Sequence, residues 1–437
     1  MMHRRIIALI VLLILSYPTS HLSKCNPLCS AMVARNRPIK TGAYYTGIYQ
    51  NLFEQLLNKD ESQINTKINQ AFNQLFYGND ETERLYYPVE PDMAYIKDIF
   101  NADVRTEGMT YGMMIAVQMD KKDEFDRLWK WSATYLQHKD PPHEHYFAWH
   151  AKPDGKIIDA NSAADGEEWY VMALLFASAR WGNGEGIFDY QAEAQKILDA
   201  MLSKEESSDL PHVVTNLFSR KEKQIVFVPA GNADDFTDPS YHVPHFYELW
   251  ARWADKENQF WCDVANTSRQ LLKKAVHPVT GLAPDYSTFE GSPIDAPWGG
   301  GHDNFQFDAW RVAMNIAVDY QWFARDEWAI EQSNRLLDFF YSQGIKTYLN
   351  QYTLDGKPLS KVDSDHSPGL VAMNAVAALA STNENRIEFV QELWDLPIPR
   401  GTFRYYDGLL YMLALLQVSG NFQIYDLSGK PIPACTP

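Results

Sequence analysis

Two kinds of helical segment alternate along this chain, and their alternation restricts the folds that it can adopt. One kind is amphipathic, with charged residues on one face, at 61–76, 122–138, 187–204, 258–275, 326–343 and 386–395. The other kind carries few charges, at 107–119, 165–181, 245–254, 304–323, 367–381 and 404–418. A helix that is apolar all round must be covered by protein on every side, whereas a helix with one charged face can lie outside. Six alternating pairs therefore predict an all-α fold, an (α/α)6 barrel of two concentric helix rings.

Short β-prone pieces interrupt the helical pattern, at 146–150 and 224–228. We expect them to form small sheets in the loops at one end of the barrel. No low-complexity linker or break in composition follows residue 45. Residues 38–437 are therefore predicted to form a single barrel domain.

The first 31 residues read as a signal peptide and leader. A basic start, MMHRR, precedes an apolar run at 6–15, which is the form of a secretory signal and too short to span a bilayer comfortably. We expect export to the periplasm or the medium, with no integral membrane span in the mature chain. The segment before Cys25 loosely resembles a bacterial lipoprotein box with an atypical lysine, so a lipid anchor at Cys25 is an alternative. The cleavage site is not defined by the sequence.

Charge and composition narrow the class of ligand. The net charge of −17 argues against nucleic acid or an anionic membrane as a partner and is compatible with a neutral ligand. Aromatic residues make up 14% of the chain, with 13 Trp and 24 Tyr, and such rings stack on sugar faces as well as filling helical cores. The four cysteines lack zinc-site spacing, and no bridge between them can be assigned.

Three acids share an unusual position at or near the start of a charge-poor segment: Glu107, Asp165 and Asp308. If these segments form the inner ring, their corresponding ends converge on one axial cleft. Carboxylates brought together there are costly to ionise together, so the pKa of at least one is raised. A carboxylic acid with a raised pKa beside an ionised carboxylate is the pair of catalytic groups that cleaves a glycosidic bond.

Each acid also has a simpler interpretation. The helix dipole favours the ionised form of Glu107, by about 0.3–1 kcal/mol, so burial and a close Asp165 would have to outweigh the dipole if Glu107 is to act as an acid. Asp165 could serve only to stabilise the N-terminus of its helix, a position that favours acidic residues. Asp308 lies three residues before Arg311, and a buried structural ion pair would explain both.

At four places the residues resemble glycoside hydrolase family 8. Residues 105–112 (RTEGMTYG) are similar to the general-acid segment of that family, and 308–311 (DAWR) to its general-base segment. Residues 165–181 (DGEEWYVMALLFASARW) resemble the family signature, and 238–241 (DPSY) the segment whose tyrosine lies against the cleavage site. The resemblance runs from about residue 45 to about 420. It implies an (α/α)6 barrel and hydrolysis with inversion at the anomeric carbon.

The resemblance also implies a role for each residue. Glu107 would be the general acid that protonates the leaving oxygen, and Asp308 the general base that activates one water on the opposite face. Asp165 would hold and help to distort the sugar at the cleavage site. Tyr241 would support that sugar or the water, and Arg311 would steady the carboxylates. No cofactor and no metal is implied.

Within the family, the chain most resembles the reducing-end xylose-releasing exo-oligoxylanases, whose substrates are xylo-oligosaccharides. The supporting pieces are 83–87 (ERLYY), 92–96 (DMAYI), 121–122 (KK) and 128–131 (LWKW). Residues 365–369 (DHSPG) lie where a loop closes the leaving side of the cleft in those enzymes, so His366 would contact the reducing-end sugar. The alternative for His366 is a loop histidine before a helix that Pro368 starts. The alternative for the function is an endo-acting β-1,4-xylanase or another β-glycanase of the family.

Candidate sugar platforms are Trp149, Trp169 and Trp298. Any of them could belong to the core, and Trp149 and Trp298 are favoured because they lie outside the expected helices. A metal enzyme is a rival hypothesis because His143, Glu144, His145 and His150 cluster in sequence, but there is no HExxH motif and no second ligand cluster. A non-catalytic glycan-binding protein would lack the acid or the base, and both are present. The sequence does not predict an oligomeric state.

Overall fold

The structure is a computed structural model that describes residues 38–207, 214–230, 233–359, 366–427 and Cys435. The chain from Pro38 onward forms one compact unit. The signal peptide and leader predicted for residues 1–31, and with them the alternative lipid anchor at Cys25, lie outside the described residues.

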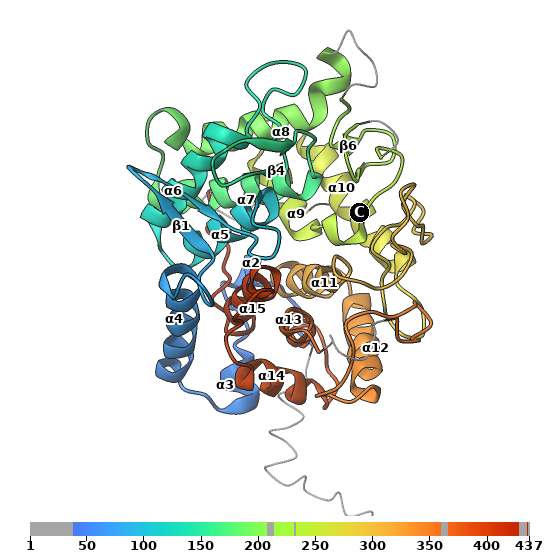
Figure 1. Cartoon of the computed structure of the whole chain (residues 1–437). Helices are drawn as coiled ribbons and strands as arrows, with labels where there is room; N and C mark the ends of the chain where they lie inside the picture. The colour runs from blue at the N-terminus through green and yellow to red at the C-terminus, as the bar shows by residue number, and fades with distance from the viewer. Residues whose placement is uncertain (1–37, 208–213, 231–232, 360–365, 428–434, 436–437) are drawn as a thin grey trace, which may run out of the picture. The chain divides into compact units, whose positions relative to one another are not determined.

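Twelve helices of the described residues form two concentric rings, as the alternation predicts. Figure 1 shows the inner helices toward the middle of the molecule and the outer helices around them. The outer helices are α4 (Glu61–Tyr77), α6 (Lys122–Trp131), α8 (Tyr190–Ser207), α10 (Asn258–Ala275), α12 (Trp328–Ser342) and α14 (Arg386–Asp395). The inner helices are α5 (Thr106–Gln118), α7 (Ala164–Trp181), α9 (Pro244–Trp253), α11 (Trp310–Phe323), α13 (Pro368–Ala377) and α15 (Arg404–Val418).

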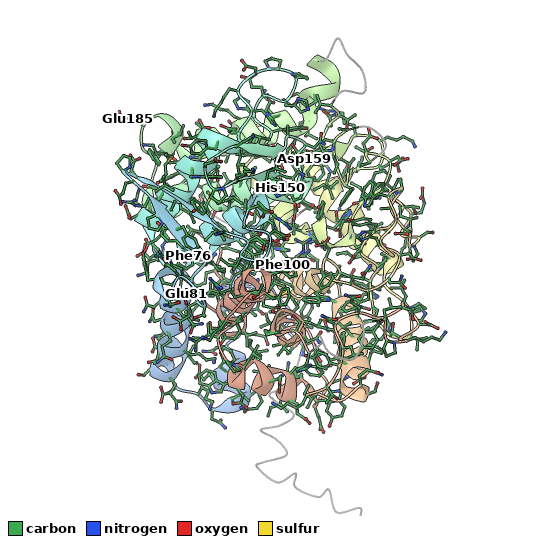
Figure 2. The ribbon with its side chains drawn as sticks, viewed as in Figure 1. Phe76, Glu81, Phe100, His150, Asp159 and Glu185 are labelled. Atoms are coloured by element: carbon green, nitrogen blue, oxygen red, sulfur yellow. A yellow bond between two sulfur atoms is a disulfide. The ribbon has the colours of Figure 1, made fainter. Side chains whose placement is uncertain are left out.

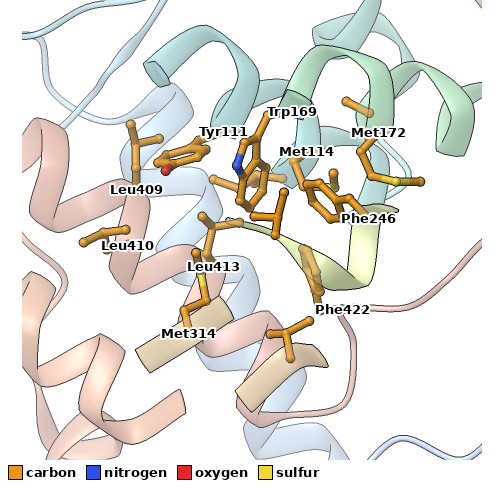
Figure 3. Close-up of a cluster of buried hydrophobic side chains, with 14 of the residues drawn as sticks. Tyr111, Met114, Trp169, Met172, Phe246, Met314, Leu409, Leu410, Leu413 and Phe422 are labelled. Carbon is orange, nitrogen blue, oxygen red and sulfur yellow. The ribbon is translucent and has the colours of Figure 1, made fainter. Parts of the chain in front are cut away.

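The inner helices are buried all round because almost every position is apolar or small. Every residue of α7 from Ala164 to Ser178 is buried. The axis of the barrel is filled with large side chains from several inner helices, and Figure 3 shows Tyr111, Trp169, Phe246 and Met314 among them. Such a helix has no solvent-facing stripe, so only a closed ring with an outer layer can bury it.

The long connections all lie before inner helices. Three residues join α5 to α6 and four join α9 to α10, for example, whereas residues 276–309 separate α10 from α11. Helices joined by short loops run antiparallel. The six inner helices therefore point the same way, and their N-terminal ends meet at one end of the barrel beneath the long loops. Residues at inner helix starts are brought together there.

Small antiparallel sheets and short helices occupy these loops. Two sheets have two strands each, β1 (Tyr86–Val89) with β2 (Met93–Ile96) and β6 (Phe218–Ser219) with β7 (Gln224–Ile225). In the third, β4 (His150–Ala151) lies between β3 (Val104–Arg105) and β5 (Ile157–Asp159). The short helices are α2 (Ala43–Thr46), α3 (Leu52–Leu57), the π-helical turn η1 (Ser132–Leu136), and the 3-10 turns η2 (Gly186–Phe188) and η3 (Pro239–Tyr241).

Two local predictions need correction. Only His150 of the piece at 146–150 lies in a strand, and Phe147 makes just an isolated bridge to Gln137. The inner helix expected from 304 begins at Trp310, because Phe305 is drawn into a bridge with Tyr352 and the loop continues through Asp308. Asp308 therefore precedes its helix.

A disulfide joins Cys262 of α10 to Cys435, a pairing that the sequence left unassigned. It ties the C-terminal end of the chain to the outer ring. Within the described ranges, no helix combines the length and the apolar character needed to cross a membrane.

Gly166 allows helices α5 and α7 to pack closely at the end of the barrel where the acids lie. A Cβ added at Gly166 would lie 2.7 Å from Cβ and Oγ1 of Thr106, which is closer than real contacts allow. We expect Gly166→Ala to push Glu107 and Asp165 apart, lowering the free energy of unfolding by about 1–3 kcal/mol. Catalytic turnover should fall in the same variant. Denaturant unfolding and activity assays check this; wild-type values for both would contradict it.

Candidate active site

Arg311 gathers the three predicted acids at the inner N-terminal ends. Its Nη1 lies 3.1 Å from Oε2 of Glu107 and 3.2 Å from Oδ2 of Asp165, and its Nη2 lies 2.9 Å from Oδ1 of Asp308. The side chain of Arg311 is only 3% exposed. Glu107 and Asp165, which lie 204 and 146 positions before Arg311, therefore share its guanidinium with Asp308. Asp308 and Arg311 are not an isolated structural ion pair, because two further carboxylates contact the same arginine.

Glu107 stands in the first turn of α5 because strand β3 leads straight into that helix. Arg105 is paired with His150 across the small sheet, and the amide of Thr106 donates to the carbonyl of Trp149. Burial raises the pKa of Glu107 to about 7; the charge of Arg311 opposes this shift, and those of Asp165 and Asp308 add to it. Burial and neighbouring acids thus outweigh the helix dipole, as an acid role requires.

Asp165 lies in the first turn of α7 and is buried. Burial raises its pKa to about 6 against the attraction of Arg311, and the charge of Asp308 raises it further.

A fourth carboxyl group, that of Asp238, lies beside the array and is fully buried. Its Oδ1 accepts the amide of Ser240 at 2.6 Å, and burial raises its pKa well above the usual range. The site therefore holds more carboxyl groups than the positive charges around it can balance.

Asp308 is the most solvent-accessible of the three predicted acids, with its side chain 32% exposed. Because the contacts of Glu107 and Asp308 to one guanidinium are 3.1 and 2.9 Å, their bound oxygens lie at most about 8 Å apart. The carboxyl groups of inverting glycosidases lie about 6.5–9.5 Å apart, which leaves room for a water. The shared arginine is compatible with that spacing.

Tyr241 lies beside this array at the end of η3. Its ring centroid is 5.8 Å from the guanidinium carbon of Arg311, and its ring stacks on Phe227. Burial raises its pKa well above the usual range, and the charges of Asp165, Asp238 and Asp308 add to the rise. The phenol thus stays protonated and can donate a hydrogen bond.

One cavity contains the acids, and a second is lined by Phe307, the residue before Asp308. The first has a volume of about 810 Å³ and is lined by Glu107, Asp165, Tyr241, Asp308 and Arg311 together with loop residues. The second has a volume of about 500 Å³ and is lined by Phe100, Phe307, Tyr405 and Tyr406 among others. Figure 2 labels Asp159, which lines the first cavity, and Phe100, which lines the second. Phe307 and Asp308, consecutive in the chain, face different cavities.

The three tryptophans predicted as sugar platforms do not all line the cavity. Trp149 and Trp298 both line the first cavity, and Trp298 is 57% exposed. Trp169 is 3% exposed and packs edge-on against Tyr111 and Phe246. The prediction of Trp169 as a platform is wrong, because its place on the helix turns the ring into the barrel core (Figure 3).

His366 lines the second cavity, where the sequence predicts a contact with the reducing-end sugar. Its ring nitrogens, however, are directed elsewhere. Nδ1 lies 3.1 Å from the carbonyl of Tyr348, and Nε2 lies 3.5 Å from the carboxylate of Glu392. The neighbouring residues 360–365 lie outside the described part of the chain.

The histidines considered above as metal ligands contact other side chains. His150 is paired with Asp103 at 2.6 Å, and the rings of His143 and His138 pack together. Among the residues that the structure describes, no group of three or more His, Cys, Asp or Glu side chains is arranged to hold a metal ion.

Several residues of the site were missed by sequence reasoning. Tyr405 and Tyr406 stand at the start of α15, the same position that singled out the acids, and a search that included tyrosines would have found them. Tyr111, whose hydroxyl is 3.0 Å from Nη1 of Arg311, is one helical turn beyond Glu107. Asp285, His302 and Tyr286 come from a loop that carries no periodic signal.

Comparison with known proteins identifies the family of this barrel. The model of glycosyl hydrolases family 8 matches residues 96–420. The chain belongs to this family. It is therefore a glycoside hydrolase, and the family's (α/α)6 barrel agrees with the two helix rings described above.

Named members of family 8 are similar to the chain over nearly their whole length. Rex8A, a reducing-end xylose-releasing exo-oligoxylanase of Paenibacillus barcinonensis, is 45% identical over 88% of this chain and 98% of its own. Its structure with xylose superposes with a TM-score of 0.83, covering 88% and 100% of the two chains at 44% identity. A reducing-end xylose-releasing exo-oligoxylanase of Halalkalibacterium halodurans is 42% identical over 89% and 97%. A family 8 xylanase of Teredinibacter turnerae, in complex with xylohexaose, gives a TM-score of 0.84 at 45% identity over 88% and 100%.

The raised carboxyl pKa values predict how stability depends on pH. Glu107 holds its proton more tightly in the folded than in the unfolded chain, so its contribution to stability is complete below the unfolded pKa of about 4.3 and is lost as pH rises through about 7. We expect Glu107→Gln to match the wild type at pH 4 and to be the more stable protein at pH 8. Urea unfolding at both values measures this.

The exposed Glu81 provides the control for this comparison. Glu81→Gln should leave the pH dependence of unfolding as it is in the wild type. The same pH dependence in Glu107→Gln as in the wild type would show that Glu107 is not the group responsible.

Proposed function

We propose that this glycoside hydrolase releases xylose from the reducing end of xylo-oligosaccharides with inversion at the anomeric carbon. The observation that carries the proposal is an acid and a base, Glu107 and Asp308, held by one buried arginine in the first cavity, while the neighbouring Phe307 lines the smaller second cavity. The similarity to the exo-oligoxylanases named above supports the choice of substrate. Rings of Trp149 and Trp298 at the first cavity suit the faces of sugars.

Glu107 acts as the general acid. At pH 6 it is mostly protonated, because its pKa is about 7, and it can give its proton to the glycosidic oxygen as the bond from that oxygen to the anomeric carbon breaks. After transfer, its new negative charge is 3.1 Å from the guanidinium of Arg311. Arg311 therefore stabilises the product state of the acid without preventing the reactant state.

Asp308 acts as the general base. Arg311 binds its Oδ1, and its partly exposed side chain borders the first cavity, where a water can be held. Asp308 takes a proton from this water as the oxygen attacks the anomeric carbon from the face opposite the leaving group. Asp165 accepts sugar hydroxyls at the cleavage site, and Tyr241 donates to the sugar or the water. No covalent intermediate is needed.

The second cavity is the proposed leaving side. Its smaller volume and its aromatic lining, with Phe100, Phe307 and Tyr406, suit a short reducing-end segment beside the acid. His366 would reach this sugar only after its ring turns away from Tyr348 and Glu392. We expect this rotation on substrate binding, at a cost of two weak polar contacts.

An endo-acting xylanase is the second candidate. The Teredinibacter turnerae xylanase is as similar to the chain as the exo-acting relatives are, and its structure was determined with a six-sugar ligand. An endo enzyme needs a leaving side open to a long chain. The two candidates share the same acid, base and arginine, so only their products distinguish them.

Export is proposed together with this function. Cys262 and Cys435 form a disulfide. Disulfides persist in oxidising surroundings and are rare in cytosolic proteins. The bond and the basic and apolar start of the sequence both support a periplasmic or secreted enzyme.

The catalytic roles predict distinct defects in two variants. Glu107→Ala should lose about 100- to 10,000-fold in turnover on xylo-oligosaccharides and much less on aryl xylosides, whose leaving group departs without a proton. Asp308→Asn should lose several orders of magnitude on both substrates, since water activation is needed for each. Steady-state kinetics on the two substrates measure the difference. Near wild-type turnover in Asp308→Asn would contradict the base assignment.

Product analysis tests the direction of attack. Xylotriose should give xylose and xylobiose, polymeric xylan should keep its viscosity, and xylotriose reduced to the alditol should be a poor substrate because its reducing-end sugar no longer fits the second cavity. Chromatography of early products measures this. Rapid loss of xylan viscosity would support the endo-acting candidate, with the catalytic residues unchanged.

A further inference from the structure

We infer that Asp285 and His302 form a positioning pair for Asp308, holding the backbone and the local charge of the proposed base. The inference rests on the proposed function, since it gives the pair its meaning through the role of Asp308. Neither residue belongs to the segments that resemble the family motifs, and neither has a part in the mechanism above.

Asp285 fixes the backbone directly after the base. Its carboxyl group is buried, at 2% exposure, and its Oδ1 accepts the amide of Ala309 at 3.0 Å. This is the first amide beyond Asp308, just before α11 begins. Asp308 lies in a loop and not in a helix, so no intrahelical hydrogen bond holds that amide. The carboxylate of Asp285 takes the place of a helix cap and sets the direction in which the Asp308 side chain projects.

His302 holds the other oxygen of Asp285. Its Nδ1 lies 3.0 Å from Oδ2 of Asp285, and its ring stacks on Tyr286 with centroids 4.2 Å apart. The amide of His302 donates to Asp295, and the amide of Asp285 donates to the carbonyl of Asn304. Hydrogen bonds between the two loop segments therefore hold the pair in place. Its hydrogen bond to Asp285 raises the pKa of His302, which favours the imidazolium.

The pair also carries charge close to the base. Burial raises the pKa of Asp285 to about 6, opposed by the hydrogen bond from His302 and increased by the charge of Asp308. The imidazolium and the carboxylate together are neutral, so the intact pair adds little net charge beside Asp308. The other charged and titratable groups that face these three residues are Glu107, Asp165, Asp238, Asp295, Arg311, Tyr241, Tyr286 and Tyr406.

Removing one member of the pair should unbalance that charge in a known direction. Asp285→Asn removes a negative charge from beside the proposed base. His302→Gln leaves the negative charge of Asp285 without its partner. Because a neighbouring negative charge disfavours a second carboxylate, the acidic limb of the pH dependence of kcat/KM should move down in the first case and up in the second.

The experiment compares four variants of the full chain on xylotriose. Asp285→Ala removes the support of the Ala309 amide and should lower kcat about 10- to 100-fold with KM within about twofold. Asp285→Asn keeps an oxygen for that amide, so it should recover most of kcat while the acidic limb moves to lower pH. His302→Gln should move the limb to higher pH. Asp303→Asn, which removes an exposed charge from the same loop, is the control and should leave both kcat and the pH profile unchanged.

Opposite movements of the acidic limb in Asp285→Asn and His302→Gln would establish the pair, since a purely structural defect would not shift the limb in two directions. Wild-type pH profiles in both variants, or a change in KM alone in Asp285→Ala, would overturn the inference. These outcomes are read beside Asp308→Asn. If that variant is inactive, only the inference fails; if it is active, the proposed function itself fails.

Discussion

One buried guanidinium makes the site possible. Arg311 contacts Glu107, Asp165 and Asp308 and also bonds the hydroxyls of Tyr111 and Ser240. Three carboxyl groups at one place would repel one another and would each lose hydration. A single delocalised cation with several donors in a fixed plane can attract all three. Burial opposes its charge, but its surroundings, including Asp308 and Glu107, outweigh burial and raise the pKa of Arg311 well above the usual range.

The barrel supplies the partners of this arginine from separate parts of the chain. Because the inner helices are apolar on every face, they close into a ring, and short connections behind them make them point the same way. Glu107 and Asp165 stand in the first turns of α5 and α7, while Ser240 and Asp308 lie just before α9 and α11. The chemistry of the site therefore depends on burial at positions far from it.

The sequence predicted most of this arrangement, and its failures have physical causes. Charge periodicity predicted the six pairs, and position at a helix start predicted the acids. Trp169 was misjudged because an aromatic ring on an all-apolar helix gives no sign of which side faces the cavity. The ring orientation of His366 depends on Glu392, a contact between segments that no local pattern reveals.

Loop residues were the hardest to foresee. Asp285 supports Ala309 across 24 positions of irregular chain, and Cys262 meets Cys435 across 173. Both contacts follow from where the loops and the C-terminal end lie on a finished barrel. Helix boundaries suffered for the same reason: α11 starts at Trp310 because loop pairing at Phe305 outweighs the helical pattern of the preceding residues.

The excess of acids over nearby cations explains how one site can hold a proton donor and a proton acceptor. The charge of Arg311 can balance one carboxylate fully, and the side chain of Asp308 is the most exposed of the three acids, so it keeps the most contact with water. Burial raises the pKa of Glu107 to about 7 against the attraction of Arg311, and the charges of Asp165 and Asp308 add to the rise. Burial and the charge of Asp308 likewise raise the pKa of Asp238 well above its usual range. The neighbouring carboxylates thus help the proposed acid to keep its proton.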